Sequence, residues 1–137
     1  MFTDAALAFL HAPRFGYLAT VGDDGMPHNV PIWYDVATTA EGAHEIVMIA
    51  DRTSRKTRNV LARPQAALTV GGLPDDREGY MIRGVVTVVH DSDQRVTHAM
   101  IDRYEHGERN AALRALWAED DIVALRLVPT AVVKVWG

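Results

Sequence analysis

The feature that most constrains the fold of this chain is a series of short β-rich runs separated by turn residues. The first run, residues 16–21, is Gly-Tyr-Leu-Ala-Thr-Val, and the next four residues are Gly-Asp-Asp-Gly. Glycine and aspartate supply the positive φ values of a tight hairpin turn, so we expect a second strand from about Pro27. The expected strands lie at residues 16–21, 27–34, 45–50, 66–70, 80–89, 122–128 and 131–136.

These strands do not alternate regularly with helices, which argues against a doubly wound parallel sheet. Sequential strands joined by short turns can pair antiparallel, and closure of the sheet hides its edges. The pattern therefore predicts a closed antiparallel barrel with helices attached. Within it, Pro31 places the second strand at an edge or a bulge, Gly84 predicts a bulge or bend, and Pro129 predicts a break between the last two strands.

Four helical segments are expected around the strands. Thr3 is a suitable N-cap for the first helix, and either Thr53 or Ser54 is suitable for the second, because a hydroxyl oxygen can accept from a free helix amide. The expected helices lie at residues 3–12, 53–62, 91–106 and 108–118.

Composition and charge indicate one globular domain, to which we assign residues 1–137. The net charge of −4 argues against a nucleic-acid partner, and the absence of cysteine excludes disulfides and thiolate chemistry. The start of the chain lacks the positive charge of a signal peptide, and no apolar run approaches the ~20 residues that span a bilayer. The expected location is the cytoplasm, without a membrane partner.

The segment Arg-Thr-Ser-Arg-Lys-Thr-Arg-Asn, residues 52–59, carries the most information about function. It holds four cations and three hydroxyl groups where a strand ends and a helix begins. Helix N-terminal amides and the helix dipole favour an anion such as phosphate, and the Arg and Lys side chains add charge. The same composition also fits a solvated basic helix, and the residues alone leave these two interpretations even.

An ordered set of short motifs resembles one protein family. The motifs are Ala19-Thr20-Val21 with Gly25-Met26-Pro27, Val30-Pro31-Ile32-Trp33, Ser54-Arg55-Lys56, and Pro64-Gln65-Ala66-Ala67-Leu68. Over about residues 14–90, their order and spacing resemble the pyridoxamine 5′-phosphate oxidase-like flavin-binding split barrels. The deazaflavin (F420)-dependent reductases share that fold and much of the pattern. The resemblance implies a mainly β fold with α, namely a six-stranded antiparallel split β-barrel (FMN-binding split barrel) with a few peripheral helices.

The resemblance also implies where a cofactor binds. Arg55 and Lys56 would hold its phosphate, with hydroxyl contacts from Ser54 and Thr53. Strand residues would run beside the isoalloxazine ring and along the ribityl chain. The implied cofactor-binding residues are Val30, Pro31, Ile32, Trp33, Ile49, Ala50, Thr53, Ser54, Arg55 and Lys56. No catalytic side chain is expected, because the cofactor itself performs the redox chemistry.

FMN is the favoured cofactor, because Ser54-Arg55-Lys56 follows the oxidase pattern, and F420 is the alternative. The resemblance implies an oxidoreductase for a small-molecule substrate, active as a homodimer in which residues 79–83 of the partner complete the site. Family oxidases carry an arginine at the position of Val30, which implies weaker or different cofactor binding here. They also end in an Arg- and His-rich segment that this chain lacks, so pyridoxamine phosphate oxidation is not expected. A non-enzymatic flavin or haem carrier or sensor is the alternative of another class.

Histidine and tryptophan residues give weaker indications. The six histidines fall mostly in different predicted elements, so no metal site is expected. Trp33 can stack near a flavin ring or pack in the core, and these two interpretations stay even. Trp117 and Trp136 are expected to be packing residues.

Overall fold

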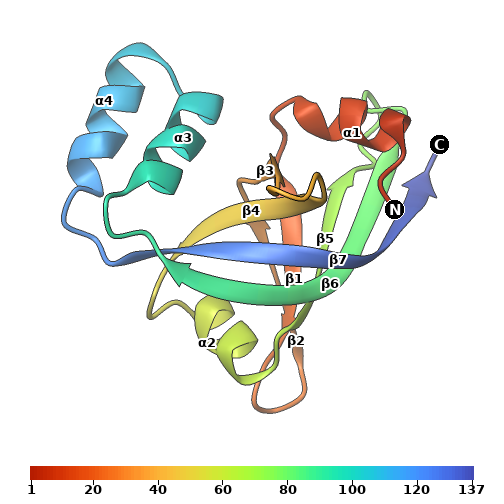
Figure 1. Cartoon of the computed structure of the whole chain (residues 1–137), viewed down its shortest axis with the longest axis horizontal. Coiled ribbons are helices and arrows are strands. Elements are labelled where there is room, and N and C mark those ends of the chain that lie inside the picture. Colours follow the sequence, from red (N-terminus) through yellow and green to blue (C-terminus); the bar gives the residue numbers. More distant parts are fainter.

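The computed structural model describes residues 1–137 as four helices and seven strands (Figure 1). The elements in chain order are α1 (Asp4–His11), β1 (Gly16–Val21), β2 (Pro27–Ile32), β3 (Asp35–Thr38), β4 (His44–Asp51), α2 (Arg55–Ala62), β5 (Gln65–Gly71), β6 (Gly79–His90), α3 (Arg95–Tyr104), α4 (Gly107–Leu116) and β7 (Ile122–Trp136).

All seven strands join one antiparallel sheet in the order β2-β1-β5-β6-β7-β4-β3. The sheet curls strongly around a single core, with α1 at one end and α2 at the other (Figure 1). The prediction of a mainly β split barrel with peripheral helices is confirmed. The predicted closure is wrong, because β2 and β3 remain edge strands with no ladder between them.

The resemblance implies six strands, and the structure has seven. The pattern of β-rich runs also gave seven, but its last two runs form the single strand β7. The strand that the pattern missed is β3, whose four residues lie in a segment that reads as a polar loop. Its pairing with β4, from Asp35 opposite Val47 to Thr38 opposite His44, supplies the hydrogen bonds that define it. A strand this short is set by its partner rather than by its own β-propensity.

Pro129 does not break the last strand, contrary to the prediction, since β7 runs without interruption from Ile122 to Trp136. The register between β6 and β7 shifts between Arg83 and Gly84, and Gly84 lies opposite Pro129. A bulge leaves ladder positions unpaired, so a proline without an N–H is tolerated there. A Cβ atom on Gly84 would overlap the Val128 carbonyl, which confirms the predicted bulge at this glycine.

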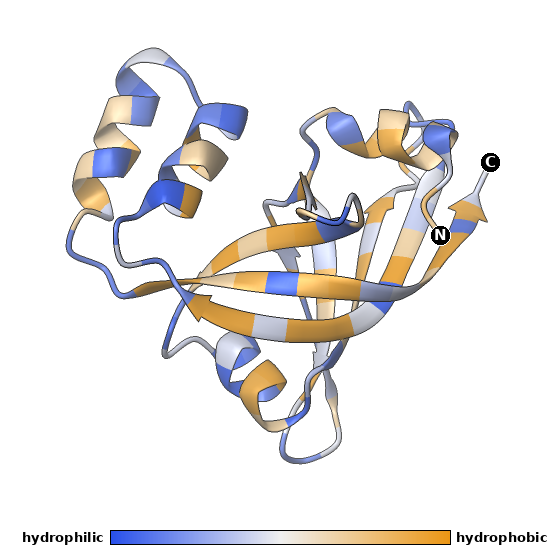
Figure 2. Ribbon diagram, viewed as in Figure 1, coloured by the Kyte–Doolittle hydropathy of each residue, from blue (hydrophilic) through white to orange (hydrophobic).

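The core lies inside the curled sheet, where apolar side chains from different strands meet. The strands of the sheet are largely hydrophobic (Figure 2). Leu18, Leu68, Ile82 and Leu125 come from four strands and are fully buried. Alternate residues of β1 and of the middle of β6 point inward, as the period of two for a strand requires.

The helices α3 and α4 form a hairpin that stands beside the sheet (Figure 1). Met100 and Ile101 of α3 are buried, whereas α4 has no buried residue. α4 therefore depends on contacts with α3 and with the segments at its two ends.

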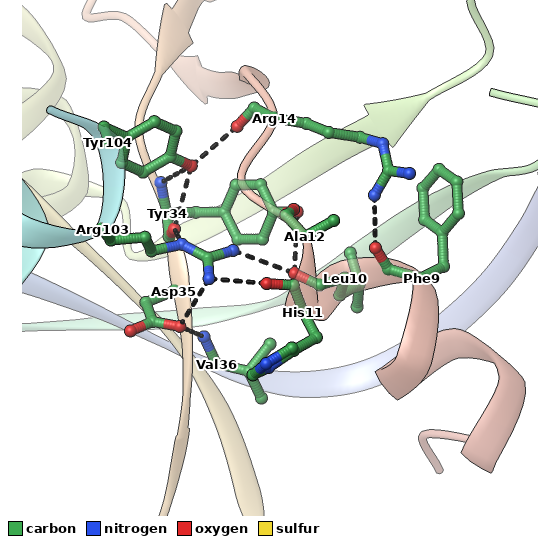
Figure 3. A network of polar contacts seen from close by, with 10 residues as sticks. All are labelled: Phe9, Leu10, His11, Ala12, Arg14, Tyr34, Asp35, Val36, Arg103 and Tyr104. Atoms are coloured by element: carbon green, nitrogen blue, oxygen red, sulfur yellow. Dashed lines mark hydrogen bonds and ion pairs between the residues drawn. The ribbon is translucent and has the colours of Figure 1, made fainter. Parts of the chain in front are cut away.

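A polar network attaches α3 to α1 and to the start of β3 (Figure 3). The Arg103 guanidinium donates to the carbonyl oxygens of Leu10 (3.0 Å), His11 (2.7 Å) and Tyr34 (2.8 Å). Two of these carbonyls belong to the last turn of α1, where a cation complements the helix dipole. The start of β3, immediately after the predicted ring-contacting residues, is thereby held in place.

Candidate functional site

Two unpaired strand edges flank one opening of the sheet. β2 pairs with β1 on one side only, which confirms the edge position predicted from Pro31. β4 pairs with β3 only through His44–Val47, so residues 48–51 have β7 as their single partner. Trp33 and Tyr34 connect β2 directly to β3, so the free edge of β2 and the free end of β4 border the same gap. Backbone N–H and C=O groups there are available to a ligand.

The residues predicted beside a cofactor ring lie along the free edge of β2. Val30 is half-buried, Pro31 is exposed, and Ile32 is buried in the core. This alternation leaves Ile32 as a core residue whose backbone, rather than its side chain, faces the edge.

A pocket of about 190 Å³ opens beside the free end of β4. It brings together three predicted residues, Ile49, Ala50 and Lys56. Its other lining residues, which the sequence did not indicate, are Asp51, Trp117, Asp120 and Ile122. The pocket thus combines an apolar floor from strand residues with one cation and two carboxylates at its rim.

The N-terminus of α2 supplies further groups next to this pocket. The Ser54 hydroxyl oxygen accepts from the Thr57 N–H at 3.4 Å, so Ser54 rather than Thr53 is the N-cap. The N–H groups of Arg55 and Lys56 have no partner within the chain, as is usual for the first turn of a helix. Two free amides and the Lys56 ammonium therefore lie together, which is suitable for an anion.

Arg55 and Lys56 face different recesses, although they are neighbours in the sequence. Arg55 lines a second recess of about 360 Å³, together with Arg58, Asn59, Asp23 and Ala62. Neither Arg55, Lys56 nor Arg58 forms a salt bridge. Successive helix residues differ by about 100° in direction, which explains why the two cations diverge.

The fourth cation of the segment, Arg52, is engaged elsewhere. Its Nε lies 2.9 Å from the Asp121 carboxylate, and its Nη2 lies 2.7 Å from Nδ1 of His90. Arg52 thus connects the segment before α2 to the last residue of β6 and to the residue that precedes β7.

An aromatic cluster extends the pocket toward β2. The Trp33 ring stacks on Tyr104 of α3, with centroids 4.6 Å apart and planes within 2°. Trp117 lies 6.2 Å from Trp33 at a tilt of 59°. One face of Trp33 is therefore covered by the Tyr104 ring, and the side toward Trp117 adjoins the pocket. Because Trp117 lies far from Lys56 in the sequence, only the tertiary structure reveals that they share a pocket.

No group of three or more His, Asp or Glu side chains is arranged to hold a metal ion. None of the four helices is both long and apolar enough to cross a bilayer.

An open, curled antiparallel sheet with an anion-suited helix N-terminus beside a free strand end defines the class of flavin-binding split barrels. The family model described as pyridoxamine 5′-phosphate oxidase matches residues 2–132. The chain belongs to this family.

Three similar proteins illustrate the range of the family. The chain is 34% identical over 105 residues to 5a,11a-dehydrotetracycline/5a,11a-dehydrooxytetracycline reductase of Streptomyces rimosus, covering 77% of this chain and 71% of that protein. A solved F420 reductase superposes with a TM-score of 0.75 at 24% identity, covering 96% of this chain and 98% of the other. A pyridoxamine 5′-phosphate oxidase-related FMN-binding protein of Nostoc punctiforme superposes with a TM-score of 0.61 at 18% identity, covering 88% of this chain and 74% of the other. The two superpositions establish the fold, and the Streptomyces relative supports assignment of this chain to the oxidoreductases.

Proposed function

We propose that this protein is a reductase that binds a flavin-type cofactor and reduces a small organic molecule. F420 is the first candidate for the cofactor. The observation that carries the proposal is the pocket in which Lys56 lies beside the free end of β4 at Ile49 and Ala50. The free amides at the start of α2 belong to Lys56 and to its neighbour Arg55. The cofactor, when bound, supplies a hydride at its ring.

The residues of the chain bind the cofactor and orient it. Lys56 and the N–H groups of Arg55 and Lys56 hold the phosphate, with the Thr53 and Ser54 hydroxyls at the rim. The backbone of residues 30–33 addresses the polar edge of the ring, and Ile49 and Ala50 line the path between ring and phosphate. No side chain is required as an acid or base in this scheme.

The two cationic recesses favour F420 over FMN. FMN carries one phosphate group, which the Lys56 pocket can satisfy alone. F420 carries a phosphodiester followed by glutamate carboxylates, so it has anionic groups for both the Lys56 pocket and the recess of Arg55 and Arg58. The apolar Val30, where family oxidases carry an arginine, agrees with a cofactor other than FMN.

FMN remains the second candidate, because Ser54-Arg55-Lys56 follows the oxidase pattern and Ser54 is the helix cap that this pattern requires. Binding of FMN and F420 to the purified protein, followed by cofactor fluorescence, separates the two. We expect Lys56→Ala and Arg55→Ala each to weaken F420 binding about tenfold, the scale of one lost charge-assisted contact. For FMN, only Lys56→Ala should have such an effect.

A matched control is Arg109→Ala, because Arg109 is an exposed arginine near the start of α4 and lines neither of the two recesses. Equal loss of F420 binding in this variant would show a general charge effect and would contradict the assigned pocket. Absence of binding by both cofactors would reject the proposed function.

Turnover separates an enzyme from a carrier. Reduced F420 should be oxidised in the presence of a conjugated organic acceptor, with one hydride transferred per molecule of acceptor. Tight binding without any turnover would favour the alternative of a flavin carrier or sensor, and a Soret band in the purified protein would favour a haem carrier.

A further inference from the structure

We infer that Trp117 is a cofactor-binding residue, held by Gln94 so that its indole forms the outer wall of the pocket opposite β4. This inference rests on the proposed function. It assigns to the site a residue from the α3–α4 hairpin, which no motif in the sequence connects with the cofactor.

The position of Trp117 is the first part of the argument. Its ring lines the same pocket as Ile49, Ala50 and Lys56, at the end of α4. Trp33, at the end of the predicted ring-contacting segment, lies 6.2 Å away. Trp117 therefore lies between the proposed ring end and the proposed phosphate end of the cofactor.

The exposure of Trp117 is the second part. Its side chain is only half-buried, although Trp33 and the pocket residues surround it. A tryptophan that served only to pack α4 on the body would be accompanied by other buried α4 residues, and α4 has none. The exposed part of the indole is thus available to a ligand, and aromatic rings stack favourably on such surfaces.

The anchoring of Trp117 is the third part. Nε2 of Gln94 donates to the Trp117 carbonyl oxygen at 2.8 Å, across the base of the hairpin. Gln94 has φ of 55°, in the left-handed region that costs a non-glycine residue about 1 kcal/mol. This hydrogen bond holds the main chain from which the indole projects, and Gln94 keeps a strained backbone conformation at the residue that donates it.

Cofactor affinity in three tryptophan variants tests the inference. We expect Trp117→Ala to raise the Kd for the bound cofactor about tenfold, mainly through faster release, and Trp117→Phe to stay within about threefold. Trp136→Ala is the matched control, because Trp136 is exposed at the far end of β7, and its Kd should be unchanged. Circular dichroism and thermal unfolding verify that each variant is folded.

Gln94→Gly tests the anchoring separately, because glycine keeps the left-handed φ while removing the side-chain amide. It should raise the dissociation rate of the cofactor without lowering the thermal midpoint. An unchanged Kd in Trp117→Ala and Trp117→Phe, or an equal loss in Trp136→Ala, would overturn the inference while leaving the proposed function intact. If the unaltered protein bound neither FMN nor F420, the proposed function itself would fail.

Discussion

At the residue scale, single side chains in the polar network show how burial changes chemistry. Tyr34 is fully buried, and its hydroxyl lies 3.0 Å from the Leu10 carbonyl and 3.2 Å from the Ala12 carbonyl. Burial, with a smaller contribution from nearby Tyr104, raises the pKa of Tyr34 to about 12. Burial also raises the pKa of Tyr104, whose hydroxyl donates to the Arg14 carbonyl (Figure 3).

The raised pKa of Tyr34 predicts a loss of stability in alkali. Because the folded-state pKa lies above the unfolded value near 10, the contribution is fully present below pH 10 and disappears between about pH 10 and pH 12. The full effect is about 2–3 kcal/mol. Thermal unfolding across this range measures it. Tyr34→Phe should flatten the dependence, leaving the parts from Tyr104 and Tyr80, whose pKa values burial also raises. The exposed Tyr17→Phe is the control and should change nothing.

Gly84 is the residue whose replacement the backbone tolerates least. Because a Cβ atom would overlap the carbonyl of Val128, Gly84→Ala must open the β6–β7 bulge. We expect a loss of about 3 kcal/mol or more in the free energy of unfolding, measured by urea denaturation. Gly72→Ala is the control, because Gly72 has positive φ but open space around it and should lose only about 1–2 kcal/mol. Equal losses in both variants would contradict the steric argument.

At the scale of the elements, caps decide where the helices begin. Ser54 caps α2, and the sequence predicted a hydroxyl cap at either Thr53 or Ser54, because the cap residue and the amides it serves are close neighbours in the chain. The residue that caps α3 lies further along the chain from the amides that it serves. The buried Asp91 accepts from the N–H of Val96 at 3.2 Å, and from the N–H and hydroxyl of Thr97 at 2.8 and 2.7 Å.

Removal of the Asp91 carboxylate should therefore destabilise the α3–α4 hairpin. Asp91→Ala leaves buried donors of Thr97 without a partner, and we expect a cost of about 2–4 kcal/mol. Asp91→Asn keeps one acceptor oxygen and should lose less. Hydrogen exchange of the α3 amides locates the effect, and urea denaturation gives its size. An Asp91→Ala variant with unchanged stability would show that α3 does not need this cap.

At the scale of the whole molecule, exposed apolar residues gather on the outer face of β6 and β7. Val85 and Val89 of β6 and Val128 of β7 each expose 40–43% of their surface, and Val85 pairs directly with Val128. Contiguous apolar surface of this kind favours association with another protein surface. We therefore propose a homodimer that covers this face.

Sedimentation velocity tests the homodimer. The unaltered protein should sediment with twice the mass of the chain, and Val85→Arg should sediment as a folded monomer, because a charge would be buried in the interface. Leu73→Arg changes an exposed loop residue away from this face and should leave the dimer intact. An unaltered protein that is monomeric at all concentrations would contradict the proposal.

The sequence by itself determined those features that depend on near neighbours. The hairpin turn after β1, the Ser54 cap and the cationic start of α2 follow from turn chemistry, capping and helix-terminal charge, all of which act within a few residues. The bulge at Gly84 was likewise readable, because only glycine fits where two backbones approach closely.

Only the tertiary structure decided the features that depend on distant partners. β3 exists because β4 pairs with it, and β7 continues past Pro129 because the bulge at Gly84 removes the need for a donor there. Helix geometry alone makes Arg55 and Lys56 diverge, but the recess that each of them lines is completed by residues from distant segments, among them Trp117, whose carbonyl accepts from Gln94. Register, helix orientation and the sharing of a pocket arise from contacts between segments far apart in the chain, which local residue preferences do not encode.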